Sequence, residues 1–190
     1  MKDSALPQKQ GLYDPAYEHD ACGVGFVVHI KGAKSHSIVA QGLQILKNLT
    51  HRGATGWDPL LGDGAGILIQ VPDGFLQEEL GKQGISLPAA GHYSVGMVFL
   101  PQPDQSRAAC QALVEEYIIK EDQQILGWRD VPVDNQGISE DAKRCQPVIR
   151  QVFIGRGSNC ADQDAFERKL FVIRKQVEHA VRAKNLSGGE

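Results

Sequence analysis

The chain has 190 residues, of which 42% are hydrophobic and 23% are charged. These proportions are typical of a soluble globular domain and exclude a disordered or fibrous chain. Its 20 Lys and Arg and 23 Asp and Glu give a formal net charge of −3. That near-balance argues against a nucleic-acid partner, and it gives no reason to expect an anionic membrane surface as a partner.

The sequence also argues against several other protein classes. No apolar run reaches the roughly 18 residues of a membrane helix, and the polar N-terminus has no signal-peptide core. The four cysteines are scattered and form no CxxC pair, so we expect no disulfide framework and no metal or cofactor site in this segment. They are Cys22, Cys110, Cys145 and Cys160. The expected compartment is a reducing cytoplasm.

The first third of the chain predicts a tail, a strand and a helix. Residues 1–21 are polar and turn-rich. Residues 22–30 form an apolar, β-rich run that predicts a strand, in which Gly23 and Gly25 carry no side chain on one face and so allow close approach to the backbone. An apolar stripe then predicts a helix with Ser35 as its N-cap and an end near Gly53. The stripe comprises Val39, Leu43, Leu46 and Leu49.

The rest of the chain alternates predicted strands and helices. Strands are expected at 62–71, 93–100, 125–133 and 147–154. Helices are expected at 75–80, after an Asp104 cap, and after an Asp162 cap. Cys110 is expected in the core, and the basic residues of the last helix on a solvated face. The interleaved elements indicate an α/β or α+β class. Because no strand follows the last helix, we expect an incomplete domain.

Cys22 is the strongest candidate for a catalytic residue, although a lone cysteine at the start of a strand is usually a small buried hydrophobic residue. If the chain were cut after Ala21, Cys22 would carry a thiol and a free α-amine on one carbon. An α-amine has a pKa of about 7.7–8.0 in model peptides, so it can take the thiol proton near neutral pH. One residue would then supply both the nucleophile and its base.

Long motifs resemble one family over nearly the whole chain. GLYDPAYEHDACGVGFVVHIKG (11–32) and HRGATGWDPLLGDGAGIL (51–68) are similar to the N-terminus of glutamate synthase large subunits. YSVGMVFLPQ (93–102), GWRDVPVD (127–134), PVIRQVFIGRG (147–157) and the FERKLFVIRK helix follow in the family's order.

This resemblance implies an N-terminal class II glutamine amidotransferase domain, an N-terminal-nucleophile hydrolase. The implied fold is α+β, an αββα sandwich of which residues 22–190 form the N-terminal portion, with residues 1–21 removed as a propeptide. Cys22 becomes the nucleophile that hydrolyses L-glutamine to glutamate and ammonia. Arg52, in the HRG motif, lies beside it and supports the thiolate. Without the resemblance, Arg52 has the simpler interpretation of a helix-end residue that binds backbone carbonyls.

Other motifs carry no catalytic role in this interpretation. Gly62, Gly64 and Gly66 of the GDGAG turn are expected to pack closely against the nucleophile's strand, and Asp63 is not expected to act in catalysis. Neither glycine motif leads into a helix, so a dinucleotide site is not expected. His19 with Cys22 does not make a metal site, and Trp57 and Trp128 are expected in the core or at a rim.

One departure from the family matters for activity. The family's oxyanion donors lie in an HNGEIN-type motif and its substrate clamp in an HSRFST-type motif, and neither occurs here. Losing one oxyanion donor costs about 10²–10³ in rate. We therefore expect the substrate-binding residues beyond residue 190, and we expect the 190-residue chain alone to be inactive.

The resemblance also implies the larger enzyme. In glutamate synthases the released ammonia is added to 2-oxoglutarate, with FMN and a 3Fe-4S cluster in other domains and electrons from NADPH or ferredoxin. The implied partners are L-glutamine, the remaining synthase domains and a small NADPH-oxidising subunit. Two alternatives stay open: another class II amidotransferase with a different ammonia acceptor, or a truncated interaction module that has lost catalysis.

Overall fold

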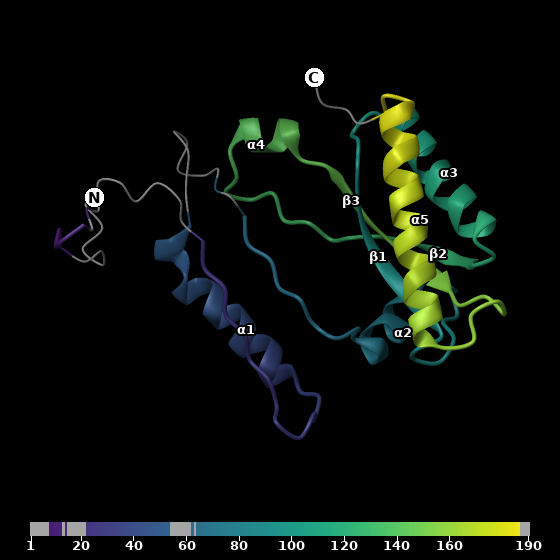
Figure 1. Ribbon diagram of the computed structural model, residues 1–190. Helices are drawn as coiled ribbons and strands as arrows, with labels where there is room; N and C mark the ends of the chain where they lie inside the picture. The colour runs from purple at the N-terminus through teal and green to yellow at the C-terminus, as the bar shows by residue number, and fades with distance from the viewer. Residues whose placement is uncertain (1–7, 13, 15–21, 54–61, 63, 187–190) are drawn as a thin grey trace. The chain divides into compact units, whose positions relative to one another are not determined.

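The computed structural model describes residues 8–12, 14, 22–53, 62 and 64–186 of the chain (Figure 1). They belong to two compact units, one within residues 1–70 and 135–143 and the other within residues 71–134 and 144–190. The described residues combine helices with a three-stranded antiparallel sheet. The mixed α+β class is therefore confirmed.

The first unit is organised around helix α1, His36–Asn48, which continues into the short 3-10 helix η2, Thr50–Arg52. Ser35 is the N-cap of α1, as predicted, although its side chain makes no capping hydrogen bond. Before α1, Gly32 donates its N–H to the carbonyl of His29 (2.8 Å) and has a φ of +70°, which favours glycine. This turn reverses the chain, and residues 22–30 run alongside α1 (Figure 1).

Two predicted strands are not formed, and one helix was not predicted. Within the described residues, segments 22–30 and 64–71 belong to no β-ladder. The apolar pattern is present in both segments, but a strand also needs a hydrogen-bonded neighbour, which sequence periodicity does not supply. The helix that the sequence did not reveal is α4, Glu140–Cys145, a six-residue element too short to show an apolar period.

The second unit contains the sheet. Its strands are β1 (Tyr93–Leu100), β2 (Gln124–Asp130) and β3 (Val148–Gly155), in the order β1-β3-β2. Both pairings are antiparallel, with Tyr93 and Gln124 each opposite Gly155, and a bulge interrupts β2 between Ile125 and Gly127. The three predicted strands are confirmed here, although β2 ends at Asp130 rather than at residue 133.

Three helices pack on this sheet: α2 (Asp73–Gly81), α3 (Asp104–Lys120) and α5 (Gln163–Ala183). The predicted cap of α5 is confirmed, because the Asp162 side chain accepts a hydrogen bond from the Ala165 N–H at 2.7 Å. The predicted cap of α3 is off by one residue. Pro103 is the N-cap, and Asp104 is instead the first helical residue, where its charge favours the helix dipole.

The central strand β3 divides the core between its two faces. Val152 and Ile154 pack with residues of α3 and α5, including Phe166, whereas Phe153 packs with Leu76 and Leu80 of α2. This alternation follows the period of two in a strand. α3 and α5 lie side by side over one face (Figure 1). Cys110 on α3 is buried, which confirms its predicted place in the core.

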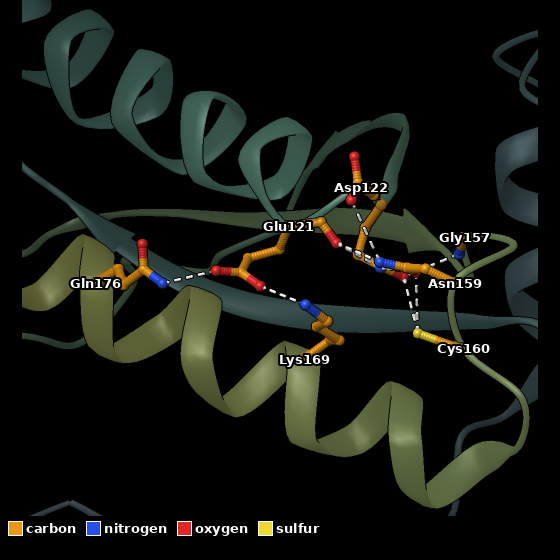
Figure 2. Close-up of polar contacts among 8 residues, drawn as sticks. Glu121, Asp122, Gly157, Asn159, Cys160, Lys169 and Gln176 are labelled. Carbon is orange, nitrogen blue, oxygen red and sulfur yellow. Dashed lines mark hydrogen bonds and ion pairs between the residues drawn. The ribbon is translucent and has the colours of Figure 1, made fainter.

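A polar network joins α3, α5 and the loop after β3 (Figure 2). The Glu121 carboxylate accepts hydrogen bonds from Lys169 Nζ and Gln176 Nε2, each at 2.7 Å. The hydrogen bond with Lys169 lowers the pKa of Glu121 and raises the pKa of Lys169. The Glu121 main-chain carbonyl accepts from Gln123 Nε2 and Asn159 Nδ2, so the end of α3 is held on both sides.

Candidate functional site

Cys22 and Arg52, thirty residues apart in the sequence, meet in the first unit. Arg52 Nε donates a hydrogen bond to the main-chain carbonyl of Cys22 at 3.2 Å. Cys22 is exposed and Arg52 is half-buried. The guanidinium therefore lies next to the residue whose thiol is the candidate nucleophile, and it binds that residue through its backbone.

The end of α1 explains how Arg52 reaches Cys22. The Arg52 N–H donates to the Leu49 carbonyl at 2.8 Å and the Gly53 N–H donates to the Thr50 carbonyl at 3.1 Å, which tightens the chain into the 3-10 turn η2. Thr50 Oγ1 donates to the Lys47 carbonyl at 2.7 Å and satisfies one of the free carbonyls at the helix end. The HRG motif thus begins inside a hydrogen-bonded turn.

The two glycines after Cys22 give α1 close access to the backbone. A Cβ built on Gly23 would lie 2.9 Å from Leu49 Cδ2 and 3.3 Å from Arg52 Cβ. A Cβ built on Gly25 would lie 2.5 Å from Ile45 Cγ2. The prediction that these glycines allow close approach is confirmed, and the approaching element is α1.

Sequence reasoning did not find Ile45 as part of this site. The predicted stripe included Leu43, which is instead 44% exposed, whereas Ile45 is half-buried against the Cys22 segment. One sequence feature could have revealed it. Ile45 and Leu49 are four residues apart, which is one helical turn, and Gly25 and Gly23 are two apart, which is the repeat of an extended chain, so the two pairs match in length.

The expectation of close packing in the GDGAG turn is wrong for Gly64 and Gly66. Among the described residues, nothing lies within 4 Å of a Cβ built on Gly64 or Gly66, so close packing does not require glycine there. Gly64 instead has a φ of +91°, a conformation that side chains disfavour. Asp63, Ala21, His19 and Trp57 lie outside the described residues.

The other cysteines differ from one another in exposure. Cys110 and Cys160 are buried, and burial raises the pKa of the Cys110 thiol, which disfavours the reactive thiolate. Cys22 and Cys145 are exposed. Within the described ranges, no group of three or more His, Cys, Asp or Glu could hold a metal ion. None of the helices in those ranges has the length and apolar character needed to cross a membrane.

Comparison with known families assigns the class of this chain. The family described as "Glutamine amidotransferases class-II" matches residues 22–189, so the match begins at Cys22 and covers most of the chain. The chain belongs to the class-II glutamine amidotransferases.

Within that class the chain is similar to glutamate synthases. It is 48% identical over 179 residues to the glutamate synthase [NADPH] large chain of Bacillus subtilis, covering 94% of this chain and 12% of that protein. It is 45% identical over 183 residues to the glutamate synthase [NADH] of Schizosaccharomyces pombe, covering 93% of this chain and 9% of that protein. A ferredoxin-dependent glutamate synthase of Arabidopsis thaliana is 37% identical over 179 residues, covering 94% of this chain and 11% of that protein. The chain therefore spans roughly a tenth of the length of these relatives.

Proposed function

We propose that this chain supplies the nucleophile of a glutaminase within a glutamate synthase, and that Cys22 is that nucleophile once residues 1–21 are removed. Arg52 is the residue that supports it. Two observations favour this proposal. The family match starts at Cys22, and Arg52 Nε lies 3.2 Å from the Cys22 carbonyl oxygen.

The proposed reaction uses the Cys22 α-amine as its base. The amine takes the proton from the thiol, and the thiolate forms a bond to the side-chain amide carbon of glutamine. The resulting tetrahedral oxyanion collapses, the carbon–nitrogen bond breaks, and the α-ammonium returns its proton to the departing nitrogen as ammonia. Water then attacks the glutamyl thioester with the α-amine again as base, releasing glutamate and the free thiol.

Arg52 contributes to this chemistry through position and charge. Its bond to the Cys22 carbonyl leaves the thiol and the α-amine available, because neither group is used in that contact. In this proposal the positive charge of the guanidinium stabilises the negative charge that develops as Cys22 attacks the amide. Arginine suits this task since it stays protonated at any working pH.

The remaining proposals concern the larger enzyme. We propose that the domain completes an αββα sandwich, and that its ammonia passes to 2-oxoglutarate in a cytoplasmic protein that carries FMN and a 3Fe-4S cluster elsewhere. Among the described residues, no group of three or more His, Cys, Asp or Glu could hold a metal ion, so we place the cluster in the other domains. A small NADPH-oxidising subunit is a further proposed partner, and the similarity to synthases named for NADPH supports it.

The test is covalent labelling of the complete gene product with diazo-oxonorleucine, an electrophilic glutamine analogue, followed by peptide mass spectrometry. We expect one label per chain on Cys22, which is found as the N-terminal residue. Cys145→Ala is the matched control, because Cys145 is the other exposed cysteine, and it should label normally. Cys22→Ala should remove the label and the release of ammonia from glutamine.

Two further results would contradict the proposal: labelling that persists in Cys22→Ala, or full glutaminase activity in a mature protein that retains residues 1–21.

Arg52→Ala should lower glutaminase activity about 10- to 10²-fold, the range for a lost charged hydrogen bond. For the 190-residue chain alone we expect no measurable ammonia release, because its sequence lacks the family's oxyanion motif.

A further inference from the structure

The contact between α1 and the Cys22 segment has matched spacings. Four residues along a helix advance about 6 Å, and two residues along an extended chain advance about 6.6 Å. Ile45 and Leu49 are four apart on α1, and they meet Gly25 and Gly23, which are two apart. Both side chains can therefore sit over consecutive glycines of the same face without either segment bending.

The packing at Gly25 leaves no room for a methyl group. A Cβ there would be 2.5 Å from Ile45 Cγ2, whereas ordinary contact begins at 3.4 Å. Isoleucine on a helix keeps one strongly preferred χ1 rotamer, and its Cγ2 is attached directly to Cβ. The clash therefore cannot be relieved by swinging the side chain, so the Cys22 segment and α1 have to separate by about 1 Å.

This packing differs from a hydrophobic core. α1 contains no buried residue, and the opposite face of the segment is open, with Val24 90% and Phe26 85% exposed. Among the described residues, the backbone near Cys22 is restrained by the Gly23 and Gly25 contacts with α1 and by the hydrogen bond from Arg52. A shift at Gly25 would thus displace Cys22 and lengthen that hydrogen bond.

We propose that Gly23 and Gly25 are positioning residues for the nucleophile: their missing side chains let Leu49 and Ile45 of α1 hold the Cys22 backbone in place for attack on the substrate. This inference rests on the proposed function, in which Cys22 attacks glutamine. Gly23 and Gly25 touch no reacting atom, and they act through the position of Cys22.

The test enlarges residue 25 and then shortens the side chain that it meets, in the complete gene product. The measured quantities are kcat and KM for glutamine hydrolysis. Gly25→Ala should lower kcat about 10²-fold, the cost of moving a catalytic group by about 1 Å, while KM changes less than threefold. The double variant Gly25→Ala with Ile45→Ala should recover at least tenfold in kcat. In the double variant the Ile45 Cβ that remains lies 3.7 Å from the new methyl group, an ordinary contact.

Two controls separate positioning from general damage. Gly74→Ala adds the same methyl group where nothing lies within 4 Å and should leave kcat unchanged. Circular dichroism melting of each variant reports folding. Wild-type kcat in Gly25→Ala would overturn the inference. A kcat that falls only as far as the fraction of folded protein falls, and that the double variant does not recover, would also overturn it. Failure of the proposed function is distinguishable, because it would appear as full activity in Cys22→Ala.

Discussion

Gly157, in the loop between β3 and α5, occupies a position where an added methyl group should be strongly destabilising. Its N–H donates to Gln123 Oε1 at 2.8 Å, and it lies within the network of Figure 2. A Cβ on Gly157 would lie 3.1 Å from the Asp122 carbonyl carbon, nearer still to the carbonyl oxygen, and 3.0 Å from Asn159 Oδ1. Since ordinary contact begins at 3.4 Å and a main-chain carbonyl cannot rotate away, the loop must retreat from Asp122.

The cost has two parts. Forcing an extra carbon into a packed site costs about 1–3 kcal/mol. The retreat also breaks the hydrogen bond to Gln123, which is only 5% exposed, and a buried group left unsatisfied costs a further 1–3 kcal/mol or so. We therefore expect Gly157→Ala to lower the free energy of unfolding of the second unit by about 2–6 kcal/mol.

Urea unfolding followed by tryptophan fluorescence measures this change. The chain has two tryptophans, so a Trp57→Phe background leaves Trp128 on β2 as the single reporter. Gly81→Ala is the matched control, because nothing lies within 4 Å of its Cβ and the residue is helical. It should stabilise the unit by about 0.4–1 kcal/mol. Equal midpoints for the two variants would refute the packing argument.

Three further predictions concern the second unit. Phe166→Ala, at a fully buried position, should lower its free energy of unfolding by about 3–5 kcal/mol in urea, whereas Phe171→Ala on the same helix, 56% exposed, should have little effect. Burial, with the hydrogen bond to Asp73, raises the pKa of Tyr93 to about 12. The contribution of the neutral Tyr93 hydroxyl to stability is therefore complete below pH 10 and is lost as the pH rises towards 12. If Tyr93→Phe leaves the alkaline slope of the unfolding free energy unchanged, this reasoning is wrong. The hydrogen bond from Lys169 lowers the pKa of Glu121. The ionised Glu121 carboxylate therefore stabilises the unit above the ordinary carboxyl pKa of 4.5, and this stabilisation is lost as the pH falls through the lowered pKa. Glu121→Gln should make the unfolding free energy less dependent on pH in the acid range.

The second unit was the more predictable part of the fold. Its strands and helices carry apolar residues at the spacing that each element needs, and both faces of β3 are buried, so pattern and packing agree at residues such as Val152 and Phe153. The Asp162 cap was also predictable, since the interaction spans three residues. In the first unit the same patterns predicted strands at 22–30 and 62–71 that the described residues do not form.

By itself, the sequence determined the family, the helix and strand segments of the second unit, and the candidate pair Cys22 and Arg52. These follow from local composition, spacing and the order of motifs. Only the tertiary structure decided that Arg52 binds the Cys22 carbonyl, that Ile45 and Leu49 contact Gly25 and Gly23, and that Gly64 has a backbone angle that favours glycine. The physical reason is that a periodic pattern shows which face of an element is apolar, whereas the neighbour of that face is chosen by contacts between residues distant in the chain.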